Sequence, residues 1–121
     1  AGAIEEALAQ HADVAECAVI GAADELKGQV PFGLVVLKAG VERDEDEIER
    51  ELVQSVRAQV GAVASMKRVS VVDRLPKTRS GKILRSTMRA IADGRDYKIP
   101  STIEDPTALE HIEQRLRDGG P

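Results

Sequence analysis

One short stretch of the chain concentrates side chains that could act on a charged substrate. Residues 75–85 read LPKTRSGKILR, so four basic side chains surround a Ser-Gly pair. Serine is a favourable N-cap, and we therefore expect a helix to follow Ser80, with Gly81 and Lys82 in its first turn. That turn exposes unpaired N–H groups and the positive end of the helix dipole, to which a lysine adds further positive charge. The pattern predicts a site for an anionic ligand, and a solvated basic loop is the competing interpretation.

The spacing within this stretch excludes one common phosphate-binding motif. A P-loop also ends in Gly-Lys, but it needs a glycine at its start and a serine or threonine directly after the lysine. Here Pro76 stands at the first position and Ile83 at the last. The sequence therefore does not predict nucleotide binding of the P-loop type.

The distribution of charge also favours a specific anion site. The 121-residue chain has a formal net charge of −4, yet residues 67–89 hold eight bases and one acid, whereas residues 42–51 hold seven acids and two bases. An acidic protein that gathers its bases in one segment is expected to present them to a particular partner. An alternative function is a stand-alone anion- or RNA-binding module built on residues 67–89. Base stacking would require more aromatic side chains than the 2% present. A protein-interaction domain with an acidic helix over 44–60 is a third interpretation, with no feature that favours it over a solvated face.

The composition gives little support to other classes of function. Cys17 is the one cysteine, which excludes an internal disulfide and a cysteine-based metal cluster. His11 and His111 have no second ligand at metal spacing, so we expect no metal site. No apolar run approaches the roughly 20 residues that cross a bilayer, and the first residues do not resemble a signal peptide. We therefore expect no membrane partner. Because the chain begins at Ala1 without Met, we expect a fragment or a processed product.

The elements that must position the basic stretch follow from hydrophobic periodicity and turn signals. Two apolar segments typical of strands are separated by a loop that Gly28 and Pro31 punctuate. A helix follows, with Asp44 and Glu47 as a capping-box pair and Gly61 as its C-terminal cap. The expected elements are a helix over 3–11, strands over 14–20 and 32–38, a helix over 44–60, a strand over 69–73, a loop over 75–81 and a helix ending near 93–94.

This order of elements predicts the fold class. A strand–helix–strand passage must cross over a sheet, so we expect an α+β domain with a small mixed three-stranded sheet plus a hairpin, packed with helices. We assign this domain to residues 1–94. Residues 95–121 are expected to form an extended C-terminal arm that wraps the surface and carries a short helix over 108–117, capped by Thr107 with Glu110.

The segment PKTRSGK, followed by an amphipathic helix, resembles the C-terminal motif of the adenylate-forming acyl-CoA synthetases, in which it lies on a small mobile domain. Within that family the chain is most similar to the short-chain acetyl- and propionyl-CoA synthetases, and its tail is most similar to the propionyl-CoA synthetases. The resemblance covers nearly the whole chain. The other segments that carry it are IEEALAQHADVAECAVIG, ADELKGQVPFGLVVLK, VRAQVG and YKIPSTIEDPTALEHIE.

The resemblance implies a two-step ligase. Acetate or propionate and ATP, with Mg²⁺, first give an acyl-adenylate and pyrophosphate. Coenzyme A (CoA) then attacks the adenylate to give the thioester and AMP. Lys82 matches the lysine that bridges the carboxylate and the α-phosphate in the first step, and Thr78, Arg79, Ser80 and Gly81 match the substrate loop around it.

The resemblance also implies a CoA contact. Arg57, in VRAQVG, matches an arginine that contacts the 3′-phosphate of CoA. A role for Arg57 in complementing the dipole of its own helix stays equally open. The loop around Gly28 matches a region that faces the active site in the thioester step.

The implied partners follow from what a small C-terminal domain lacks. The nucleotide and acyl pocket is expected in an N-terminal adenylation domain of the same chain, upstream of Ala1, so this segment alone is expected to be inactive and to bind no cofactor. Because the domain must move, Lys82 is expected to be exposed, and such lysines are targets of a lysine acyltransferase and deacylase that control its charge. We expect a cytoplasmic protein, or one of the mitochondrial matrix in a eukaryote, with no nucleic-acid partner.

Overall fold

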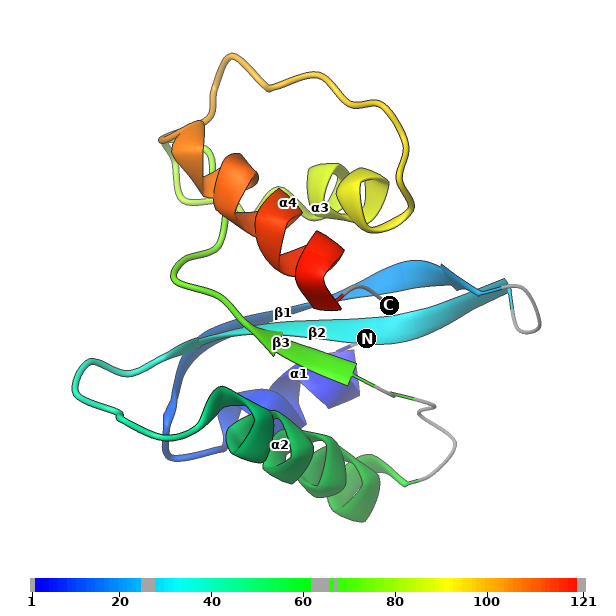
Figure 1. Ribbon diagram of the computed structural model, residues 1–121, viewed down its shortest axis with the longest axis vertical. Coiled ribbons are helices and arrows are strands. Elements are labelled where there is room, and N and C mark those ends of the chain that lie inside the picture. The colour runs from blue at the N-terminus through cyan, green and yellow to red at the C-terminus, as the bar shows by residue number, and fades with distance from the viewer. Residues whose placement is uncertain (1, 25–27, 62–65, 67, 120–121) are drawn as a thin grey trace.

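The computed structural model describes residues 2–24, 28–61, 66 and 68–119, which form a three-layer arrangement. A central sheet carries α1 and α2 on one face and α3 and α4 on the other (Figure 1). This arrangement confirms the predicted α+β class. In chain order the elements are α1 (Gly2–Ala9), β1 (Val14–Asp24), β2 (Gly28–Leu37), α2 (Glu45–Val60), β3 (Arg68–Val71), α3 (Arg85–Ala92) and α4 (Thr107–Gly119).

The sheet has the strand order β1-β2-β3. β1 and β2 form an antiparallel hairpin in which Ile20 lies opposite Phe32, and β2 pairs in parallel with β3, with Val35 opposite Val71. The chain passes through α2 between the two parallel strands, as a strand–helix–strand order requires. The predicted mixed three-stranded sheet is therefore confirmed.

Both strands of the hairpin extend into the segment that the sequence predicts as a loop. Pro31, expected to lie in that loop, instead belongs to β2, opposite Gly21. The carbonyl of Val35 accepts a hydrogen bond from Val72 on the β3 side, and alternation along a strand directs the nitrogen of Pro31 toward the same side. Since the pairing with β3 begins only at residue 32, a proline at residue 31 removes no hydrogen bond from the sheet.

Side chains are buried on both faces of the sheet, which explains why its strands read as nearly continuous apolar runs. On one face, Val35 belongs to the cluster that contains Leu52 of α2. On the other face, Phe32 belongs to the cluster that contains Met88 of α3 and Ile112 of α4. The segment between α3 and α4, residues 95–106, contains no helix and is called the arm below (Figure 1).

Two predicted helix caps differ from the structure. Asp44 precedes α2 but makes no side-chain capping bond, and Glu47, its expected capping-box partner, lies 3.3 Å from the guanidinium of Arg43 instead. Thr107 is already helical, and the carboxylate of Asp105 accepts its amide hydrogen bond at 3.0 Å. Arg43 thus binds Glu47, and Asp105 binds Thr107. In each place a neighbouring side chain binds the residue that the local sequence pattern assigns to the cap.

Candidate functional site

The lysine-bearing segment is a tight hairpin and not the start of a helix. The amide of Thr78 donates to the carbonyl of Lys82 at 2.8 Å, and the amide of Leu84 donates to the carbonyl of Pro76 at 3.0 Å. The amide of Gly81 closes the turn by donating to the carbonyl of Thr78 at 2.8 Å. We call residues 76–84 the lysine hairpin. The prediction that Gly81 and Lys82 lie in the first turn of a helix is therefore wrong.

The conformation of Gly81 explains this difference. Its φ of +93° lies in the region that glycine adopts readily and that a helix does not use. Ser80 consequently caps no helix; its hydroxyl lies 3.0 Å from the hydroxyl of Thr78. The first helical residue of α3 is Arg85, so a helix N-terminus supplies no free amides at Lys82.

Thr78 holds the backbone of Lys82 from two directions. Besides the bond from its own amide, its hydroxyl oxygen accepts the amide hydrogen bond of Lys82 at 3.1 Å. The side chain of Lys82 is exposed, as expected, and its ammonium makes no ion pair with any residue that the structure describes. It borders an open pocket of about 490 Å³ that also contains Thr78, Arg85 and Ser86. The backbone of Lys82 is thus fixed by hydrogen bonds, whereas its ammonium makes no ion pair with the described residues.

The flanks of the lysine hairpin are tied to the body of the domain. Lys77 forms an ion pair of 2.8 Å with Glu16 of β1, and Arg85 forms one of 2.7 Å with Glu5 of α1. Arg85 also donates to the carbonyl of Val19 at 3.3 Å. These bases therefore anchor the hairpin, whereas Lys82 at its turn makes no such contact within the described part of the chain.

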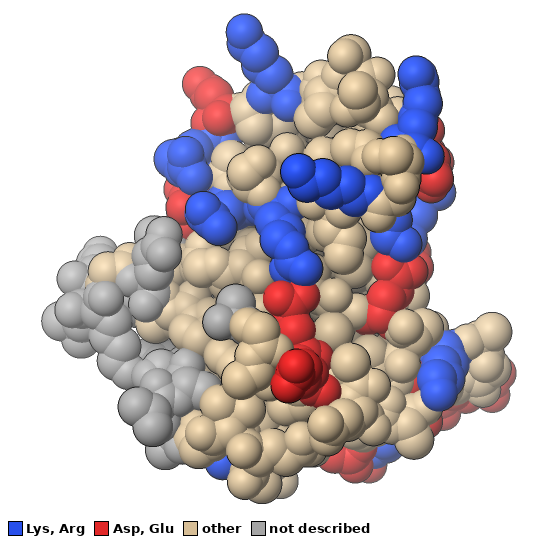
Figure 2. Space-filling view, turned by 180° about the vertical axis from the view of Figure 1, so that it is seen from behind, with Lys and Arg blue, Asp and Glu red and all other residues tan. Residues whose placement is uncertain are grey.

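The basic segment over 67–89 carries less available charge than its sequence indicates. Figure 2 shows Lys and Arg side chains gathered on the half of the surface that carries α3 and α4. Within that segment, Arg74 is paired with Asp105 at 2.6 Å, in addition to the pairs that Lys77 and Arg85 make. Since paired bases attract a polyanion less than free ones, the pairing weakens the case for an RNA-binding module.

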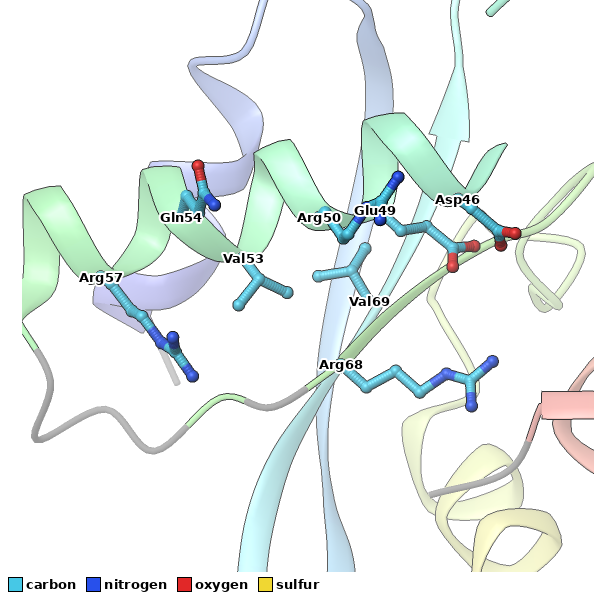
Figure 3. Close-up of a pocket in the computed structure, with 8 residues that line it drawn as sticks. All are labelled: Asp46, Glu49, Arg50, Val53, Gln54, Arg57, Arg68 and Val69. Carbon is cyan, nitrogen blue, oxygen red and sulfur yellow. The ribbon is translucent and has the colours of Figure 1, made fainter. Parts of the chain in front are cut away.

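Arg57 lies in a different place, on α2, beside an open groove of about 530 Å³. The amide of Gly61 donates to the carbonyl of Arg57 at 3.0 Å, which confirms the predicted C-terminal cap of the helix. Figure 3 shows the side chains that line the groove along α2 and β3. They are Asp46, Glu49, Arg50, Val53, Gln54, Arg57, Arg68 and Val69. The structure therefore brings Thr78, Ser80, Gly81 and Lys82 together on the side of the sheet that α3 and α4 cover, whereas α2, which carries Arg57, covers the other face (Figure 1).

Glu49 in this groove also protects the free edge of β3. Its carboxylate accepts the amide hydrogen bond of Val71 at 2.9 Å. Burial raises the pKa of Glu49, and the hydrogen bond from Val71 opposes that rise by favouring the charged form. The groove consequently contains acidic side chains as well as three guanidinium groups.

Comparison with known proteins identifies the family. Residues 3–82 match the sequence profile of the AMP-binding enzyme C-terminal domain. The chain belongs to this family. It is 52% identical over 112 residues to acyl-CoA synthetase short-chain family member B, mitochondrial, of Dictyostelium discoideum. These 112 residues cover 93% of the chain and 16% of that protein. It is 50% identical over 117 residues to acyl-CoA synthetase short-chain family member 3, mitochondrial, of Mus musculus, covering 97% of the chain and 17% of that protein.

A solved structure supports the same family. The crystal structure of the Brucella canis acyl-CoA synthetase is 36% identical to this AMP-binding C-terminal domain, with a TM-score of 0.67, over 73% of the chain and 16% of the synthetase. The matched part of the family profile ends at Lys82, so the arm and α4 lie outside it. The domain spans about a sixth of the length of the curated relatives described above.

Two further observations concern the described residues of this AMP-binding C-terminal domain. None of their helices is long and apolar enough to cross a membrane. No group of three or more His, Cys, Asp or Glu side chains among them is arranged to hold a metal ion.

Proposed function

We propose that the chain is the mobile C-terminal domain of an AMP-forming, short-chain acyl-CoA synthetase. In the full-length enzyme, acetate or propionate, ATP and CoA are converted into acyl-CoA, AMP and pyrophosphate. The observation that supports this proposal is Lys82, whose backbone is fixed by the lysine hairpin while its ammonium is exposed and makes no ion pair with described residues. Membership of the family supports an adenylate-forming reaction, in which such a lysine would be needed.

The chemistry of the first step suits an ammonium group. Attack of a carboxylate on the α-phosphate of ATP places five oxygens around phosphorus and builds negative charge there. A cation delivered to this centre stabilises the transition state more than the ground state. A point charge on a flexible stem can reach oxygens of two groups, which a planar guanidinium does less well. Lys82 is therefore the proposed catalytic residue of adenylation, and Mg²⁺ enters with ATP as a substrate.

The neighbouring residues of the loop have different proposed roles. The amides of Gly81 and Lys82 both donate within the hairpin, so they are not free to bind phosphate. Thr78, Ser80 and Gly81 therefore shape the loop. Arg79 is exposed beside them and adds a second positive charge for the phosphates of ATP.

Arg57 is proposed to contact the 3′-phosphate of CoA in the second step. It is exposed and shares its groove with Arg50 and Arg68, so the local guanidinium groups favour an anion. Its place on the opposite face of the sheet from the lysine hairpin fits an enzyme that turns a different face of this domain to the active site in each step (Figure 1). The loop around Gly28 includes residues 25–27, which lie outside the described part of the chain.

The remaining proposals concern substrates and partners. The acyl and nucleotide pocket belongs to the N-terminal adenylation domain, and propionate is the preferred acid because the tail resembles propionyl-CoA synthetases. The exposed ammonium of Lys82 is accessible to a lysine acyltransferase and deacylase, and acylation would remove its charge. The relatives named mitochondrial support a place in the matrix for a eukaryotic protein, and the cytoplasm otherwise.

The deciding experiment separates the two half-reactions in the full-length synthetase. With Lys82→Ala, formation of the acyl-adenylate should fall by about 100-fold or more, because one preorganised charge is lost from the transition state. Thioester formation from supplied acyl-adenylate and CoA should remain close to wild type. Pyrophosphate release and thioester appearance measure the two steps.

Two further variants control for charge and for nonspecific damage. Lys82→Arg keeps the positive charge and should restore little adenylation, since the guanidinium is planar and rigid. Lys98→Ala removes another exposed lysine and should leave both steps unchanged. Equal loss of both half-reactions in Lys82→Ala would argue against the proposed role.

A further inference from the structure

A segment of the arm pairs with the lysine hairpin as an additional strand. The amide of Arg79 donates to the carbonyl of Thr102 at 2.9 Å, and the amide of Glu104 donates to the carbonyl of Lys77 at 2.9 Å. Between these two bonds, Thr78 and Ile103 form an antiparallel bridge. Residues 77–79 therefore lie between two partners, the arm on one side and the strand that carries Lys82 on the other.

The same part of the arm is fixed to the body of the domain. Ile103 is only 5% exposed, so its side chain is held in the interior. Asp105, two residues further on, pairs with Arg74 at 2.6 Å and accepts the amide of Thr107 at 3.0 Å. Arg74 also donates to the hydroxyl of Thr107 at 2.6 Å. The arm thus connects the base of the lysine hairpin to the beginning of α4.

We propose that residues 102–104 are a positioning element for Lys82. Without them, residues 77–79 would lose one of their two strand partners and keep the pairing with the strand that carries Lys82 and the ion pair of Lys77 with Glu16. A displacement of about 1 Å at a reacting group can lower a rate by about 100-fold. The side chain of Lys82 is long and exposed, so the rigidity of its starting point must come from the backbone.

The arm lies outside the segment that matches the family profile, which ends at Lys82. The positioning element therefore lies outside the matched segment, as α3 does, but within the 97% of the chain that aligns with the Mus musculus relative. The inference rests on the proposed function, because it assigns the arm a role in the adenylation that Lys82 performs.

The test removes, in the full-length synthetase, one of the hydrogen bonds between the positioning element and the lysine hairpin. Glu104→Pro abolishes the amide that donates to Lys77, while Glu104→Ala keeps that amide and removes only an exposed side chain. Acyl-adenylate formation should fall by about ten-fold or more in Glu104→Pro and stay near wild type in Glu104→Ala. Thioester formation from supplied acyl-adenylate should change by less than about two-fold in both, since Lys82 does not take part in it.

A second variant and a second measurement keep the result interpretable. Ile103→Ala removes most of the buried side chain that holds residues 102–104 to the domain and changes no backbone group. It should lower adenylation selectively even if Glu104→Pro does not fold. Hydrogen exchange of the peptide that spans residues 76–84 should speed up in Glu104→Pro and Ile103→Ala. This measurement reports the loss of the contacts with the positioning element independently of activity.

The outcomes distinguish this inference from the proposed function. One outcome is faster exchange with unchanged adenylation in both variants, while Lys82→Ala still abolishes adenylation. It would overturn the positioning role of residues 102–104 and leave the proposed function of Lys82 unaffected. Unchanged adenylation in Lys82→Ala itself would overturn both. Loss of both half-reactions in Ile103→Ala would show a purely structural role and would also overturn the inference.

Discussion

At the turn of the lysine hairpin, the backbone of Lys82 makes two hydrogen bonds to Thr78, one through its amide and one through its carbonyl. Its ammonium makes no ion pair among the described residues, in contrast to Lys77 and Arg85 on the flanks. Bases that look equivalent in the sequence are thus separated by position: those on the flanks hold the hairpin, and the one at the turn stays available for a substrate. The proposed catalytic role of Lys82 depends on this separation.

Arg57 gives a second test at the scale of a single residue. In the full-length synthetase, Arg57→Ala should raise the KM for CoA by about ten-fold, the effect of losing one charge-assisted contact of about 1.4 kcal/mol to a phosphate. The KM for ATP should change little, because in the proposed mechanism ATP is used in the step that requires the lysine hairpin. Steady-state kinetics with each substrate varied in turn measure both constants.

The control for Arg57 lies in the same last turn of α2. Gln59 is also exposed but does not line the groove, so Gln59→Ala should leave the KM for CoA at its wild-type value. If Arg57 merely complements the dipole of its helix, Arg57→Ala would instead lower stability by a few tenths of a kcal/mol with an unchanged KM for CoA.

At the scale of the elements, the sequence could not predict the conformation of the lysine hairpin. Ser80 and Gly81 fit the start of a helix and the turn of a hairpin equally well, because both patterns depend on short local bonds. In the structure Gly81 adopts the positive φ of a turn, and the hairpin has a partner in a distant segment, since Thr78 pairs with Ile103 of the arm. Backbone hydrogen bonds of this kind leave no pattern of side-chain types in a sequence. The exposure of Lys82 could be predicted, but the backbone contacts that support it could not.

The sheet was predictable for the opposite reason. Its strands are buried on both faces, so apolar residues such as Val19 and Ile20 follow one another without polar interruption. The order of strand, helix and strand then required a crossover and a mixed sheet. The lengths of β1 and β2 escaped prediction because Pro31 usually signals a loop, and its tolerance here depends on where the pairing with β3 begins.

The exposed edge of β3 gives a test at the element scale. The guanidinium of Arg115 on α4 donates to the carbonyl of Val71 at 2.9 and 2.7 Å and pairs with Glu45 of α2 at 2.5 Å. Its hydrogen bond to Glu45 raises the pKa of Arg115, so this side chain stays charged. Arg115→Met should lower the free energy of unfolding by about 1–2 kcal/mol, since a strand carbonyl loses its charged donor.

Urea unfolding of the chain measures that difference. Gln114 is the neighbouring exposed residue on α4, and Gln114→Met should change the free energy of unfolding by less than about 0.5 kcal/mol. Equal stabilities of the two variants would mean that α4 is held to the sheet by its apolar side chains alone and that Arg115 contributes nothing.

At the scale of the whole molecule, a charged cluster ties together segments that are distant in the chain. Arg43 lies 3.1 Å from the carboxylate of Asp13 and 3.0 Å from that of Glu51 on α2. His11, just after α1, is hydrogen-bonded through Nε2 to Glu51 and accepts the amide of Asp13 on Nδ1 at 3.1 Å. One guanidinium and one imidazole therefore connect the end of α1, the beginning of β1 and the middle of α2. We therefore expect this cluster to make the stability of the domain depend on pH.

The direction of that dependence follows from Glu51. Its hydrogen bond with Arg43, and then that with His11, lower the pKa of Glu51 from 4.5 to about 2. A carboxyl whose pKa is lowered by folding stabilises the native state above its unfolded pKa and loses that contribution as the pH falls toward the folded value. Urea unfolding should therefore show stability that declines between about pH 4.5 and about pH 2, and Glu51→Gln should have a lower stability at neutral pH and a shallower decline. Glu42→Gln, which removes an exposed carboxylate outside the cluster, should keep the wild-type profile. Parallel pH profiles for wild type and Glu51→Gln would mean that the pKa of Glu51 is the same in the folded and the unfolded chain, and the contacts of Glu51 with Arg43 and His11 would then contribute nothing to folding.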